Sequence, residues 1–321
     1  MNYQPIYEFS DLNIEQTVCG PLNRNLALLE DELGFKISVV TGKVYAEENA
    51  DVTFLQKVLD VMARLAQNNM PVKEREIITV IGMLRNHDYE QVCEFVDKKY
   101  PIVTTYEGRT IYAKTMNQKL YLDLLNQKDV IFATGSAGTG KTWVAVGFAI
   151  NELKKNRIKR LVITRPAVEA GEKLGFLPGD LKEKVDPYLI PIYDAIYEFL
   201  GREHAEKMIE KGIIEIAPLA YMRGRTLDNA IIILDEGQNT TRNQMLMALT
   251  RLGFNSKMIV TGDITQIDLP KTSMSGLVEA VKLLSGIKQI GLIHFDKSDV
   301  MRHPIVTRII AKYEELDNDQ D

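Results

Sequence analysis

The sequence is poor in cysteine and tryptophan and has no long hydrophobic run. Only two cysteines, Cys19 and Cys93, occur among 321 residues, far apart in the chain. This excludes a disulfide-stapled fold and a cysteine-rich metal site. No stretch approaches the ~18 apolar residues that span a bilayer. The first residues show neither the basic start nor the apolar core of a secretory signal. We therefore predict a cytoplasmic protein with reduced thiols and no membrane association.

The composition is that of an ordinary globular protein. Hydrophobic residues make up 45% and charged residues 26%, which permits a sizeable core and excludes global disorder. The net charge of −5 is unevenly spread: residues 1–100 carry −6, residues 101–310 carry +5 and residues 311–321 carry −4. An acidic protein does not by itself indicate nucleic-acid binding. The mildly basic segment 101–310 is compatible with a local phosphate-binding surface.

The hydrophobic pattern changes near residue 110 and predicts two domains. In residues 1–110, apolar residues at helical spacing and a strand–turn–strand pattern over 35–46 predict a small α+β domain. The expected helices there are 22–33, 54–66, 72–85 and 89–98. In residues 111–321, helices alternate with short apolar runs, which indicates the buried parallel strands of an α/β domain. These runs are 130–133, 161–164, 213–217, 231–234, 257–261 and 289–294.

A glycine-rich segment after the first of these runs matches G-x-x-x-x-G-K-[ST] in full. It reads Gly135, Ser136, Ala137, Gly138, Thr139, Gly140, Lys141, Thr142. The strand–loop–helix context lets its backbone N–H groups and the helix N-terminus bind phosphate. We expect Lys141 to reach the β- and γ-phosphates of ATP and the Thr142 hydroxyl to ligate Mg²⁺. Trp143, the only tryptophan, is interpreted as helix packing, with a base-stacking platform as the alternative.

An acidic pair, Asp235 and Glu236, follows the apolar run 231–234. We expect Asp235 to hold Mg²⁺ through water and Glu236 to orient or deprotonate the attacking water, as an NTP hydrolase needs. A solvated turn is the alternative interpretation of such a pair. The phosphate loop upstream favours the catalytic one.

Another predicted strand ends in Thr261-Gly262-Asp263-Ile264-Thr265-Gln266. Polar groups at the carboxyl edge of a parallel sheet lie where ligands bind. Gln266 is therefore a candidate sensor of the γ-phosphate, with a polar loop and helix cap as an equal alternative.

Three further polar residues are weaker candidates. Gln118 lies upstream of the phosphate loop, and its amide could form hydrogen bonds with the edge of an adenine base. Arg302 could place its guanidinium on the transferring phosphate, in its own subunit or a neighbour's, with Arg251 as the second candidate. For Gln118 and Arg302 the alternative is an ordinary surface residue.

Together these segments resemble the PhoH-like family of P-loop ATPases. The resemblance covers about residues 111–313. Besides the phosphate loop, the segments that carry it are 164–180, 217–226, 234–239, 249–253, 262–268 and 275–277. One departure is Gly237, where the family usually has Ala. The family's P-loop domain is similar to the first RecA-like domain of superfamily 1 helicases. This similarity implies a strand-contacting role for Arg165, and it makes Gln238 and Gln266 couplers between nucleotide and partner.

The resemblance also implies partners. Relatives are ATPases linked to RNA metabolism, and some work with an rRNA-processing endoribonuclease. The α-β-β-α pattern in residues 1–110 resembles a KH-like RNA-binding fold, although this segment is acidic and lacks the G-x-x-G clamp.

Three functions remain open. The first is an ATP hydrolase that acts on single-stranded RNA, as a helicase or a remodelling motor. The second is a nucleotide-dependent switch that assembles a partner without unwinding. The third, a small-molecule phosphotransferase, is disfavoured because nothing resembles an acceptor site. About 210 residues follow Thr110, enough for one motor domain. Clamping a strand would then need a neighbouring subunit, which predicts a homo-oligomer, a closed hexameric ring.

Overall fold

The computed structural model describes residues 3–47, 50–166, 181–270 and 274–300, together with Val306 and Ile309. The chain divides into two compact units, of which the first contains the residues up to Lys99 and the second spans Tyr100–Val300. Within the described part of the chain, no helix is long and apolar enough to cross a membrane.

The first unit combines a three-stranded antiparallel sheet with helices. Its strands are β1 (Tyr3–Glu8), β2 (Ile37–Val40) and β3 (Lys43–Glu47), in the order β1-β3-β2. Its helices are α1 (Leu12–Cys19), α2 (Arg24–Leu33), α3 (Val52–Gln67), α4 (Glu74–Asn86) and α5 (Tyr89–Asp97). The four expected helices and the strand–turn–strand are confirmed, whereas β1 and α1 were not expected. Pro5 lies inside β1, and proline is tolerated there because β1 is an edge strand. The KH-like resemblance of this unit stays a prediction.

The second unit is built on a six-stranded parallel sheet. Its strands are β6 (Val130–Gly135), β7 (Arg160–Arg165), β8 (Ile214–Pro218), β9 (Ala230–Leu234), β10 (Lys257–Gly262) and β11 (Ile290–Phe295). Their order is β11-β6-β10-β9-β7-β8, and every neighbouring pair is parallel. All six expected strands are present. The predicted α/β class is confirmed, and the arrangement is the RecA-like P-loop fold that the resemblance implied.

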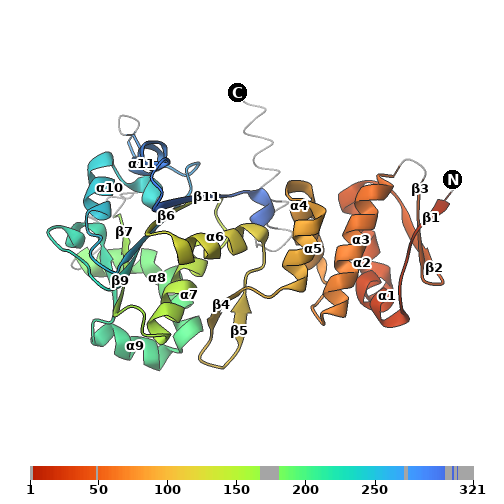
Figure 1. Ribbon diagram of the computed structural model, residues 1–321, viewed down its shortest axis with the longest axis horizontal. Coiled ribbons are helices and arrows are strands. Elements are labelled where there is room, and N and C mark those ends of the chain that lie inside the picture. Colours follow the sequence, from red (N-terminus) through yellow and green to blue (C-terminus); the bar gives the residue numbers. More distant parts are fainter. Residues whose placement is uncertain are drawn as a thin grey trace. The chain divides into compact units, whose positions relative to one another are not determined.

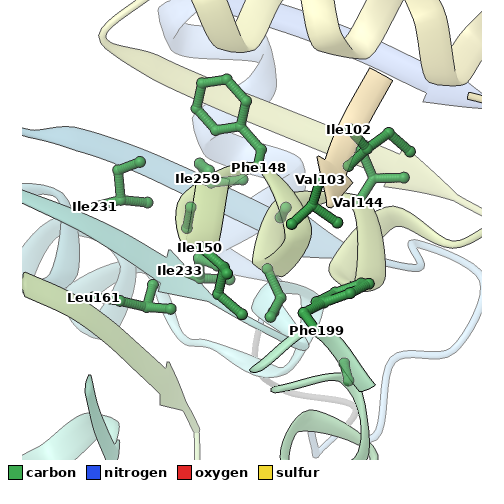
Figure 2. Packing of buried hydrophobic residues seen from close by; sticks show 14 of the residues in the cluster. Ile102, Val103, Val144, Phe148, Ile150, Leu161, Phe199, Ile231, Ile233 and Ile259 are labelled. Atoms are coloured by element: carbon green, nitrogen blue, oxygen red, sulfur yellow. The ribbon is translucent and has the colours of Figure 1, made fainter. Parts of the chain in front are cut away.

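Helices cover both faces of this sheet (Figure 1). One core contains side chains of α6 (Met116–Gln127), α7 (Lys141–Lys154), α8 (Leu181–Leu200) and α9 (Arg202–Glu210). The other contains side chains of η3 (Leu219–Met222), α10 (Arg242–Leu249) and α11 (Gly276–Leu284). The hairpin of β4 (Pro101–Thr104) and β5 (Thr110–Tyr112) adds Ile102 and Val103 to the first core. Figure 2 shows Val144 and Phe148 of α7 packed among these side chains and those of the strands.

The parallel arrangement determines where the site lies. All six strands run in the same direction, so the segments that follow them emerge at one edge of the sheet. β10 lies between β6, which leads into the phosphate loop, and β9, which leads into Asp235 and Glu236. The three polar motifs of the sequence therefore meet at neighbouring strand ends.

Candidate nucleotide site

The phosphate loop joins β6 to α7 and needs glycine at both ends. Gly135 has φ 130°, and a Cβ there would lie 1.9 Å from the carbonyl oxygen of Phe295. Gly140 has φ 82° and caps the N-terminus of α7. Only glycine adopts such backbone without strain. Glycine at these two positions lets the loop pass close to the Phe295 backbone and turn into α7.

Lys141 lies buried beneath this loop. Its Nζ donates to the carbonyl oxygens of Gly135 and Ser136, both at 2.8 Å, and to Thr139 Oγ1 at 3.3 Å. Burial lowers the pKa of the Lys141 ammonium, although Asp263 and the other nearby carboxylates act in the opposite direction. The ammonium is thus held at the loop by neutral oxygens, where an anionic phosphate would be a stronger partner.

A cavity of about 440 Å³ opens beside the loop. The sequence-predicted residues that line it are Ala137, Gly138, Gly140, Lys141, Thr142, Asp235, Glu236 and Gln266. Trp143, Pro191, Ile192 and Ala195 give it an apolar wall. Trp143 also packs against Phe199 and donates to Glu198, as the helix-packing interpretation expects. The structure therefore brings the phosphate loop, the acidic pair and Gln266 together around one space.

The Thr142 hydroxyl and Asp235 form an oxygen site of the kind that Mg²⁺ prefers. Thr142 Oγ1 donates to Asp235 Oδ1 at 2.7 Å. Among the described residues, no group of three or more His, Cys, Asp or Glu side chains is placed to hold a metal. One carboxylate and one hydroxyl, completed by water and phosphate oxygens, is the usual protein contribution to Mg²⁺ bound with a nucleotide. The residues present fit that group.

Thr261 completes this site and was not anticipated from the sequence. Its hydroxyl is buried at the end of β10, donates to Asp235 Oδ1 at 2.8 Å and lies 3.2 Å from Thr142 Oγ1. Sequence alone did not show that β10 separates β6 from β9, which is what brings Thr261 to Asp235. In the sequence, the only signal of this role is that a threonine directly precedes Gly262.

Removing the Thr261 hydroxyl should weaken magnesium binding. In Thr261→Val, which keeps the volume, Asp235 loses a hydrogen bond that orients it, and such losses cost about 10–100-fold in metal affinity. We expect the Mg²⁺ concentration needed for ADP binding, followed by the fluorescence of Trp143, to rise about 10-fold. Thr261→Ser should behave as the wild type. An unchanged Mg²⁺ requirement in Thr261→Val would show that the contact is incidental.

Both oxygens of the Glu236 carboxylate are held by neighbouring side chains. Arg165 Nη2 lies 3.2 Å from Oε1, and Gln238 Nε2 donates to Oε2 at 2.5 Å. Arg165 Nη1 is also 3.9 Å from Asp235 Oδ2. Glu236 has φ 53°, an uncommon conformation for a residue other than glycine, and such residues concentrate at functional sites. The carboxylate is thus fixed at the cavity, as a base acting on water would need to be.

A chain of hydrogen bonds joins Glu236 to the phosphate loop. Gln238 donates to Glu236, and its Oε1 accepts from the backbone N–H of Asp263 at 3.0 Å. Asp263 Oδ2 in turn accepts from the backbone N–H of Ala137 at 3.0 Å. Gln238 also donates to the carbonyl of Gln266 at 3.2 Å. We call this the Gln238–Asp263 chain; Asp263 was part of a motif in the sequence but had no predicted role.

The weaker candidates have different outcomes. The Gln118 amide is buried, donating to the carbonyl of Thr139 at 3.2 Å and accepting from the backbone N–H of Lys114 at 2.8 Å. It braces the phosphate loop from outside the cavity, and adenine reading stays a prediction. The Arg251 guanidinium donates to the carbonyls of Met247 and Arg225. Arg302 lies outside the described residues, so its role also stays a prediction.

Most of the chain is similar to known proteins. A family model described as PhoH-like protein matches residues 110–314. A PhoH-like protein of Bacillus subtilis (strain 168) is 48% identical over 291 residues, 90% of this chain and 90% of that protein. The chain belongs to the PhoH-like protein family.

Other relatives extend the match. A PhoH-like protein of Synechocystis sp. (strain ATCC 27184 / PCC 6803 / Kazusa) is 45% identical over 304 residues, 94% of this PhoH-like chain and 92% of the relative. Protein PhoH of Escherichia coli (strain K12) is 45% identical over 251 residues, 78% of this chain and 69% of the relative. Among solved structures, the Pif1 helicase from Candida albicans is similar over 57% of this chain and 39% of its own, at 16% identity and TM-score 0.31.

Proposed function

We propose that this PhoH-like protein hydrolyses ATP with Mg²⁺ and acts on single-stranded RNA. The observation that supports hydrolysis best is the Glu236 carboxylate, held on both oxygens at the cavity that Lys141 and Thr142 also line. A site that only bound nucleotide would not need an oriented base there. An oriented carboxylate beside a phosphate loop supports activation of water for attack on a phosphoryl group.

Each residue of the site has a chemical task in this reaction. The phosphate-loop N–H groups and the Lys141 ammonium bind the β- and γ-phosphates and stabilise the negative charge of the transition state. Glu236 orients the attacking water and accepts its proton, while Arg165 and Gln238 keep the carboxylate in place. Mg²⁺, held by Thr142 and Asp235, would neutralise charge on the β- and γ-phosphate oxygens.

The alternative is a nucleotide-dependent binding switch, and the Gln238–Asp263 chain favours it. This chain connects the Ala137 N–H to the loop that contains Gln266, independently of any turnover. Nucleotide binding alone could then change how that loop meets a partner. The two functions differ in whether hydrolysis is part of the cycle.

RNA is the partner that we propose for the second unit. Residues 101–310 carry a net +5, of which +3 lies in residues 101–300 of the second unit, whereas residues 1–100 carry −6, so phosphate-backbone binding is expected on the second unit. A hexameric ring is proposed as the assembly, with Arg302 completing a neighbour's site. An rRNA-processing endoribonuclease is proposed as a further partner. The ring is proposed because one motor domain would need a neighbouring subunit to clamp a strand, and the endoribonuclease follows from the family resemblance.

One experiment separates these functions. We expect the ATP hydrolysis rate to rise when single-stranded RNA is added, and light scattering to give the mass of a hexamer. Hydrolysis that RNA leaves unchanged would contradict the RNA part, and ATP binding without turnover would favour the switch. A monomer with full RNA-stimulated activity would contradict the ring and leave Arg302 with a role in its own chain.

A further inference from the structure

Two exposed side chains have no part in the nucleotide site. Tyr221, in η3, is 52% exposed, and Arg223 follows directly after η3 and is also exposed. Both belong to the segment 217–226, which helped to identify the family but had no predicted role. We call them the Tyr221–Arg223 corner.

This corner is rigidly mounted. Leu219 and Met222 are 2% and 1% exposed and anchor η3 in the second core. Arg225 makes a two-pronged ion pair with Glu215 of β8, at 2.6 and 2.7 Å. The carbonyl of Arg225 accepts from Arg251 Nη1 at 2.6 Å. The backbone of the corner is thus anchored on both sides, and a backbone that is already ordered lowers the entropic cost of binding.

The arginines of this region divide into two kinds. The side chains of Arg225 and Arg251 are both engaged with their own chain. In the described part of the chain, no ion pair or hydrogen bond is found for the Arg223 guanidinium. The fold therefore braces the corner with two arginines and leaves Arg223 directed to solvent.

The corner stands at the same edge of the sheet as the nucleotide site. η3 follows β8, and the end of β8 pairs in parallel with the end of β7, where Pro218 is the partner of Arg165. Arg165 is one of the two residues that hold Glu236. A ligand on the corner would therefore be one strand away from the residue that positions the hydrolytic carboxylate.

We propose that the Tyr221–Arg223 corner is a contact site for single-stranded RNA, with a base stacked on the Tyr221 ring and a backbone phosphate bound by Arg223. This rests on the RNA partner of the proposed function. An exposed aromatic ring two residues from an exposed guanidinium offers the stacking face and the cation with which proteins bind single strands without regard to sequence. The net charge of +5 over residues 101–310 agrees with an anionic ligand.

The test measures the affinity of the full-length protein for a fluorescein-labelled single-stranded RNA by anisotropy over a range of salt concentrations. Tyr221→Ala should weaken binding about 5- to 150-fold, the effect of losing one stacked base, while Tyr221→Phe should bind as the wild type. Arg223→Ala should reduce the slope of log affinity against log salt by about one, because one phosphate contact is lost.

The hairpin between β4 and β5 provides a matched control. Tyr106 is 61% exposed, and Arg109 is exposed on the same turn, so Tyr106→Ala and Arg109→Ala remove the same groups elsewhere on the second unit. We expect both to bind RNA as the wild type does. Melting temperatures equal to that of the wild type confirm that each variant is folded.

The outcomes are distinguishable. If the wild type binds RNA and the corner variants bind it equally well, the corner proposal is overturned, the RNA function stands, and a protein becomes the better candidate for this surface. If the wild type does not bind RNA at all, the RNA part of the proposed function fails together with the corner. Equal losses of RNA affinity in the corner and hairpin variants would also overturn the assignment, because any exposed tyrosine or arginine of the second unit would then have the same effect.

Discussion

Replacing Lys141 with alanine is expected to lower ATP hydrolysis by at least about 10²–10³-fold. Lys141 is the buried cation at the phosphate loop, and its Nζ now rests on the carbonyl oxygens of Gly135 and Ser136. Without it, the transferring phosphoryl group loses its principal protein cation while the loop loses an internal brace. The measurement is phosphate release at saturating ATP and Mg²⁺.

Lys155→Ala is the matched control for this variant. Lys155 follows the other end of the same helix, α7, and is exposed, with a 4.0 Å ion pair to Glu152. Surface pairs of this kind contribute little, so this variant should hydrolyse ATP at the wild-type rate. Wild-type turnover in Lys141→Ala would mean that the protein is not a working phosphate-loop enzyme.

Glu236→Gln is expected to slow hydrolysis about 10²–10⁴-fold while ATP binding is retained. The amide has nearly the shape of the carboxylate but cannot accept a proton from water. The phosphate loop, Thr142 and Asp235 are unchanged, so ATP should still alter the fluorescence of Trp143, which lines the cavity. Phosphate release and this fluorescence change together separate chemistry from binding.

The control for this second variant is Glu203→Gln on α9, where the carboxylate is exposed and paired with Lys207. It should leave both readouts as in the wild type. If Glu236→Gln hydrolysed ATP at the wild-type rate, another group would have to be the base. The binding-switch function would gain if the wild type itself bound ATP without measurable turnover.

The features of the fold and the site that could be predicted from the sequence have local signals in it. The six strands of the second unit are short apolar runs, and the phosphate loop is a contiguous motif whose glycines are required by backbone geometry. The acidic pair follows a strand, so its place at the sheet edge could be inferred before the strand order was known. The prediction that these residues bind nucleotide rests on such local patterns.

The parts that the sequence missed depend on which strands are neighbours. Thr261 reaches Asp235, and Asp263 reaches the Ala137 N–H, because β10 lies between β6 and β9. Strand order is a property of tertiary packing and left no periodic signal. Gln118 was placed near the loop, but the direction of its amide depends on the backbone of Thr139 and Lys114. β1 was missed because Pro5 interrupts its pattern.

The Gln238–Asp263 chain has a thermodynamic consequence. The Ala137 N–H that Asp263 now occupies belongs to the loop that would receive phosphate, so nucleotide and Asp263 compete for one donor. The far end of the chain reaches Glu236 and the loop of Gln266. Coupling of this kind is reciprocal: a ligand that favours one arrangement of the Gln266 loop changes the affinity for nucleotide, and nucleotide changes the affinity for that ligand by the same factor.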